Sequence, residues 1–127
     1  MYRKIALSIA LFLSQLWQYA TAHEMTPTYP QFRMSYIPDI AVTEMRLFNK
    51  RKDVEWYEIE VFDGEWNRIP FVSSHKVMQL NYLEQVDIEI YMRNKDLDRV
   101  LYICSTSKLR RDNTSNKIST KICSKVK

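Results

Sequence analysis

Two cysteines and two histidines are the residues of this chain best suited to redox or metal chemistry. Cys104 and Cys123 are its only cysteines. Their spacing fits two neighbouring antiparallel strands joined by a loop, and a disulfide that closes such a loop contributes on the order of 3 kcal/mol to stability. We expect the two thiols to pair if the chain is exported to an oxidising compartment, and to remain free otherwise.

His23 and His75 are the only histidines. If a leader ends at Ala22, His23 becomes the mature N-terminus, where an α-amine and an imidazole ring can bind Cu(II) together. His75 could supply a second nitrogen ligand. An exported copper-binding β-sandwich is therefore the alternative function, although no Asp-x-His motif or paired histidines accompany these two residues.

The other signatures of enzymes are missing from the sequence. Gly64 is the only glycine, which excludes a glycine-rich phosphate loop, and there is no nucleophile elbow. Glu58, Glu60, Asp87 and Glu89 alternate with apolar residues, as expected for the solvated face of a strand. We therefore predict a non-enzymatic protein without a cofactor.

Trp56 and Trp66 leave two interpretations open. Either ring could stack on a sugar or a nucleobase, but tryptophan is also common in the cores and interfaces of β-sandwiches, and we favour the core.

The first 22 residues have the pattern of a secretory signal peptide. Arg3 and Lys4 form a basic start, residues 5–13 are apolar, and residues 20–22 (Ala-Thr-Ala) form a cleavage site. The apolar run is too short to span a bilayer as a stable helix. We expect cleavage to release residues 23–127 into the periplasm as a single domain without a membrane span, and an uncleaved anchor is the alternative.

Composition and charge limit the class of partner. Loss of Arg3 and Lys4 with the leader lowers the net charge from +4 to +2, which does not indicate a nucleic-acid-binding protein. The charge is uneven, because seven lysines or arginines lie in residues 108–127 against Asp112 alone. A basic end of this kind either attracts an acidic group or protects an edge strand from unwanted pairing.

Apolar residues recur at every second position and predict strands. The sequence indicates about seven short strands separated by polar turns, a pattern typical of an immunoglobulin-like β-sandwich. The predicted strands cover residues 31–36, 41–49, 57–61, 71–80, 86–90, 99–106 and 117–126.

The last predicted strand has two unlike faces. Ile118, Ile122 and Val126 lie on one face, and Lys121 and Lys125 lie on the other. An edge strand with such an apolar face is a template for adding a strand from another chain, or it completes the protein's own core.

The order of short motifs resembles the N-terminal domain of PapD-like periplasmic pilus chaperones. Each motif is weak alone, and the specificity lies in their order and spacing. They are Glu60-Val61-Phe62-Asp63, Pro70-Phe71-Val72-Ser73-Ser74, Val77-x-x-Leu80, Val86-x-Ile88-x-Ile90 and Asp98-Arg99-Val100-Leu101-Tyr102.

The resemblance implies a chaperone that donates its last strand to an incomplete pilin-like subunit during fimbrial assembly, with an usher-type assembly platform as a further partner. Ile118, Ile122 and Val126 would be the donated side chains. Some members carry a disulfide between their last two strands, where Cys104 and Cys123 lie here.

The sequence departs from that family at several points, among them Ser74-His75 in place of a Pro-Pro pair and Leu83 in place of a glycine. The family's second domain has no counterpart here, and Tyr29 and Cys123 stand where the family has an arginine and a lysine that anchor a subunit's terminal carboxylate. Lys121 and Lys125 are the candidates to replace that lysine.

Overall fold

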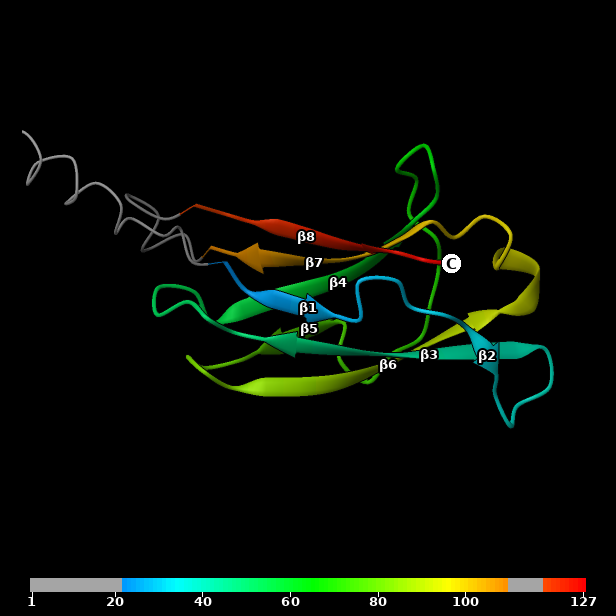
Figure 1. Ribbon diagram of the computed structural model, residues 1–127, viewed down its shortest axis with the longest axis horizontal. Helices are drawn as coiled ribbons and strands as arrows, with labels where there is room; N and C mark the ends of the chain where they lie inside the picture. Colours follow the sequence, from blue (N-terminus) through cyan, green and yellow to red (C-terminus); the bar gives the residue numbers. More distant parts are fainter. Residues whose placement is uncertain (1–21, 110–117) are drawn as a thin grey trace, which may run out of the picture.

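Two packed antiparallel β-sheets make up the computed structural model, which describes residues 22–109 and 118–127 (Figure 1). Within these residues there are eight strands and one short 3-10 helix. The elements are β1 (Glu24–Thr26), β2 (Arg33–Met34), β3 (Ile40–Phe48), β4 (Trp56–Phe62), β5 (Val77–Gln79), β6 (Gln85–Arg93), η2 (Asn94–Asp96), β7 (Tyr102–Lys108) and β8 (Lys121–Lys125).

The first sheet is built around β3. Strand β6 pairs with β3 along its whole length, while β1 and β2 pair with opposite ends of its other side. The outer face of this sheet carries charged side chains in cross-strand pairs, such as Arg46 with Asp87 at 2.7 Å. This face is solvated, as the alternation of Asp87 and Glu89 with apolar residues predicted.

The second sheet has the strand order β5-β4-β7-β8, so that β5 and β8 are its two edges. Its outer face differs from the prediction. Glu60 was expected on a solvated face, but it is only 7% exposed. Arg68, from the hairpin after β4, lies 2.7 Å from the Glu60 carboxylate and pairs with it.

The core lies between the sheets and contains one residue in two from each long strand. Leu47, Tyr57, Ile88 and Ile103 are fully buried there. The alternation that predicted the strands therefore reflects burial of one face, and the predicted all-β sandwich is confirmed.

The number of strands differs from the predicted seven, and two predicted strands are shorter than expected. Of residues 71–80, only Val77–Gln79 form a strand, because Ser73 Oγ accepts a hydrogen bond from the His75 N–H and turns the chain. Of residues 31–36, only Arg33–Met34 do, and Ser35 Oγ donates to the carbonyl oxygen of Ile40. Hydroxyl groups that bond to the main chain compete with strand pairing in both places.

The predicted signal sequence lies outside the described residues, apart from Ala22. Within residues 22–109 and 118–127, no helix is long and apolar enough to cross a membrane.

Candidate binding edge at strand β8

Strand β8 lies at the edge of its sheet and pairs only with β7 there (Figure 1). Main-chain groups in a strand alternate in direction. Because the Val126 N–H donates to the carbonyl oxygen of Leu101 beside β7, the N–H groups of Lys121, Cys123 and Lys125 point the other way, toward the edge.

The C-terminal end of this edge is covered by the segment that follows β1. The N–H of Lys125 donates to the carbonyl oxygen of Thr28, and the N–H of Lys127 donates to that of Pro30, both at 3.1 Å. Strand β1 lies close to β8, but within the described residues no strand pairs with the edge further back, at Lys121 and Cys123. The edge is therefore closed at its end and lacks a paired strand at its start.

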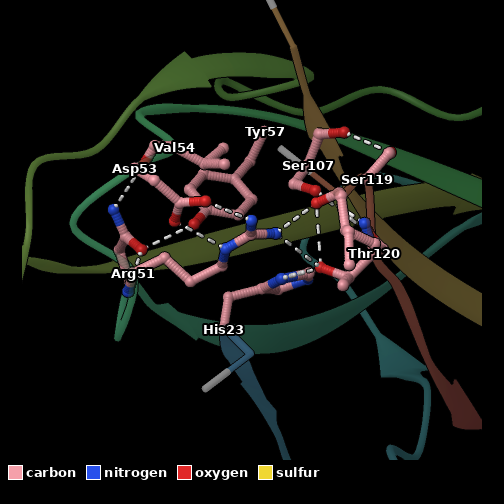
Figure 2. Close-up of polar contacts among 10 residues, drawn as sticks. His23, Arg51, Asp53, Val54, Tyr57, Ser107, Ser119 and Thr120 are labelled. Carbon is pink, nitrogen blue, oxygen red and sulfur yellow. Dashed lines mark hydrogen bonds and ion pairs between the residues drawn. The ribbon is translucent and has the colours of Figure 1, made fainter. Parts of the chain in front are cut away.

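The start of β8 is held by a buried arginine (Figure 2). Arg51 is 6% exposed and donates from Nη1 to the carbonyl oxygen of Ile118 at 2.6 Å. The other side of the guanidinium donates to both carboxylate oxygens of Asp53, at 3.0 and 2.6 Å. One charged group thus connects the loop after β3 to the residues that lead into β8.

Serine and threonine side chains add a second set of contacts at this point. Ser107 Oγ accepts from the N–H of Thr120 at 2.7 Å, and Ser119 Oγ donates to the carbonyl oxygen of Ser107, also at 2.7 Å. These bonds extend the contact between the two segments to the residues that precede Lys121, the first residue of β8.

Asn49 organises the loop that carries Arg51. It is fully buried, and its Nδ2 donates to the carbonyl oxygens of Val54 and Leu80, both at 2.8 Å. Its Oδ1 accepts from the Arg51 N–H and from the Tyr57 hydroxyl. Burial raises the pKa of Tyr57 to about 12, so this hydroxyl keeps its proton and remains a donor.

His23 lies inside this cluster, with its ring 4.8 Å from that of Tyr57. Its Nε2 is 2.8 Å from Ser105 Oγ and 3.1 Å from the carbonyl oxygen of Ser105, and because a carbonyl oxygen can only accept, we assign the ring hydrogen to this nitrogen. Nδ1 then accepts from Thr120 Oγ1 at 3.2 Å. Burial, together with the charge of Arg51, lowers the pKa of His23, although the bond to Ser105 opposes this.

These contacts bear on the copper alternative. Both ring nitrogens of His23 are used within the protein, and the ring would have to leave the interior to bind a metal. His75 lies before β5, where its Nδ1 is 2.9 Å from Ser74 Oγ. Within the residues that the structure describes, no group of three or more His, Cys, Asp or Glu side chains is placed to hold a metal ion.

The predicted partner-binding residues fall into different environments. Ile118 precedes β8 and is 74% exposed. Ile122 and Val126 are partly buried and pack against the protein's own core. Lys125 is exposed, and the Lys121 ammonium lies 4.7 Å from the centre of the Phe62 ring.

Cys104 and Cys123 face each other directly across β7 and β8 and form the predicted disulfide, with 4.1 Å between their Cα atoms. The pair occupies a position where the two residues exchange no main-chain hydrogen bonds, and side chains approach most closely there. The disulfide fixes the middle of β8 to β7.

Sequence reasoning missed the cluster around Asn49 and Arg51, which it placed at the end of the predicted strand 41–49 and in the polar turn that follows. The relevant contacts join residues far apart in the chain, such as Arg51 with Ile118, and no local pattern marks them.

No protein-family model matches this sequence, and no curated protein matches it.

Proposed function

We propose that this protein is an exported, immunoglobulin-like β-sandwich that binds another exported protein by strand addition at the start of β8. The observation that carries the proposal is the unequal edge of β8, whose end is covered by the protein's own chain while its start has no paired strand. Main-chain groups at such an edge can hydrogen-bond to an added strand in the way that neighbouring strands do.

The apolar contact falls to Ile118 in this proposal. Its side chain is 74% exposed although Arg51 fixes its main chain. Covering an isoleucine of this kind contributes roughly 1 to 2 kcal/mol. Ile122 and Val126 hold β8 on the sandwich, and Lys121 borders the docking site with a positive charge.

Two observations support an extracytoplasmic site of action. The Cys104–Cys123 disulfide is of the kind that persists in oxidising compartments. The first 22 residues read as a signal peptide. The resemblance to PapD-like chaperones makes a pilin-like subunit the proposed partner, with an usher-type platform as a further one. No step of this activity requires a catalytic residue.

The test compares two exposed apolar residues on opposite edges of the same sheet. Ile118→Asp places a charge at the proposed contact, and Val77→Asp places one on β5, where Val77 is 57% exposed. Each variant is co-expressed with the exported fimbrial subunits of the source organism, and the subunits that co-purify are identified.

Loss of the subunit with Ile118→Asp and its retention with Val77→Asp is the expected result. Equal retention by both variants, or the absence of any co-purifying subunit with the unchanged protein, would contradict the proposal. Circular dichroism and thermal unfolding of both variants establish that the fold is intact.

A further inference from the structure

Trp66 forms an exposed aromatic surface on the outer face of the second sheet. Its ring lies almost parallel to that of Tyr102, with planes at 5° and centroids 4.6 Å apart, and it meets Phe62 edge-on at 5.6 Å. Trp66 is nevertheless 53% exposed, so the core position expected from the sequence is wrong for this residue. One face of its ring rests on Tyr102, and about half of the residue stays accessible to a ligand. We call these three residues the Trp66 platform.

The backbone of the hairpin holds this ring in place against its conformational preference. Trp66 has φ of 65°, a left-handed conformation that is strained for a bulky residue. Asp63 stabilises the loop, because its Oδ1 accepts from the N–H groups of Glu65 and Asn67, both at 2.9 Å. Gly64, two positions earlier, does not take the left-handed position. Such strain persists where surrounding contacts hold the backbone, and the bonds that Asp63 accepts do so here.

Two cations border the platform. Lys125 lies directly opposite Tyr102 in the β7–β8 register, and Lys121 Nζ lies over Phe62. Neither lysine forms an ion pair with another described residue, whereas Arg68 on the same face is paired with Glu60. Of the nearby acids, Glu60 is paired with Arg68 and Asp63 is bonded within its own hairpin, which leaves Glu65 against the two lysines and favours a ligand with negative charge.

We propose that the Trp66 platform binds an anionic sugar, a pyranose ring that carries a carboxylate, sulfate or phosphate group. The C–H groups on one face of a pyranose are apolar and weakly positive, and they suit the negative face of an indole ring. The acidic group then pairs with Lys125 or Lys121. Among the described residues, Trp66 makes ring contacts with Phe62 and Tyr102 alone, which fits a sugar whose second face stays hydrated better than it fits a nucleobase that stacks on both faces.

Only Lys121 borders both this site and the proposed strand-addition site. The platform lies at the end of β8 that Thr28 and Pro30 cover, and strand addition uses the start at Ile118. Because the key variants change Trp66 and Ile118, the two proposals can fail separately.

The test uses protein purified from cells that express the full chain, titrated with an oligomer of galacturonic acid and followed by calorimetry. A neutral oligomer of galactose and a mononucleotide serve as comparison ligands. The key variant is Trp66→Gly, because glycine adopts φ of 65° without strain and the loop can keep its shape. Tyr36→Ala is the control, since Tyr36 is an 88% exposed aromatic residue elsewhere on the molecule.

We expect the galacturonic acid oligomer to bind, Trp66→Gly to weaken binding about tenfold or more, and Tyr36→Ala to leave it unchanged. Lys125→Ala, at an exposed position, should weaken binding of the acidic oligomer more than that of the neutral one. The proposal is overturned if the acidic oligomer does not bind, if Trp66→Gly binds it equally well, or if the mononucleotide binds more tightly than the oligomer.

Discussion

The two ends of β8 are fixed in different ways. At its end, Lys125 and Lys127 donate main-chain hydrogen bonds to Thr28 and Pro30. At its start, one main-chain bond joins the Ser107 N–H to the carbonyl oxygen of Thr120, and the side chains of Arg51 and Ser107 add further bonds. Main-chain bonds are available to almost any sequence, whereas these side-chain bonds depend on particular residues.

This difference links the stability of β8 to its proposed role. A strand edge that is closed by its own chain cannot accept another strand. An edge that is held in place by side chains can keep its position and still leave its outer main-chain groups for a partner, as proposed for the start of β8. Single substitutions should therefore loosen the start of β8 while leaving its end in place.

The largest expected effect comes from removing the disulfide, which fixes the middle of β8 to β7. The double change Cys104→Ala and Cys123→Ala should lower the free energy of unfolding by about 3 kcal/mol, because the unfolded chain is no longer constrained by the crosslink. Urea denaturation measures this. A loss below about 1 kcal/mol would mean that pairing and packing alone hold β8 on β7.

The next effect concerns the start of β8. Arg51→Ala removes the charged donor to Ile118 and should destabilise the fold by about 2 kcal/mol, since hydrogen bonds from charged groups are among the stronger ones. Thr28→Ala is the matched change at the other end and should fall within about 0.5 kcal/mol of the unchanged protein, because the Thr28 carbonyl is kept. If Arg51→Ala and Thr28→Ala lower the free energy of unfolding equally in urea denaturation, the two ends of β8 do not differ in their dependence on side chains.

A smaller effect follows from the hydroxyl of Thr120. Thr120→Val keeps the shape of the side chain but removes the donor to His23 Nδ1. We expect the free energy of unfolding, measured with urea, to fall by about 1 kcal/mol. A Thr120→Ser variant retains the hydroxyl and should recover most of this stability. If it does not, the effect of Thr120→Val comes from packing of the methyl group.

The smallest effect is a dependence on pH. Burial, together with the charge of Arg51, holds the pKa of His23 below 6.5 in the folded protein. The unfolded chain therefore takes up a proton near pH 6.5 while the folded chain does not, and the free energy of unfolding falls as the pH drops from 6.5 through the lowered pKa. Urea denaturation at several pH values measures this, and His23→Asn should lack the decline. If His23→Asn shows the same decline in the free energy of unfolding, groups other than His23 cause it.

Local sequence patterns predicted the parts of the fold that depend on alternation. Residues 41–49 and 86–90 were recognised because every second side chain is buried, and Cys104 and Cys123 because their spacing suits adjacent strands. Short strands were misjudged where the hydroxyl groups of Ser35 and Ser73 bond to the main chain. Such competition is not visible in hydrophobic periodicity.

The candidate site was only partly predictable for a different reason. The sequence indicated an edge strand with Ile118 on it, but not that Arg51 and His23 would support its start. Those contacts span 67 residues from Arg51 to Ile118 and 97 from His23 to Thr120. Only the packing of the two sheets brings such residues together.

Amide hydrogen exchange in the free protein, followed residue by residue by NMR, tests the central claim most directly. The edge-facing amides of Lys121 and Cys123 should exchange much faster than those of Lys125 and Lys127, which bond to Thr28 and Pro30. Equal protection along all four amides would show that the start of β8 is closed as well, and would contradict a docking site there.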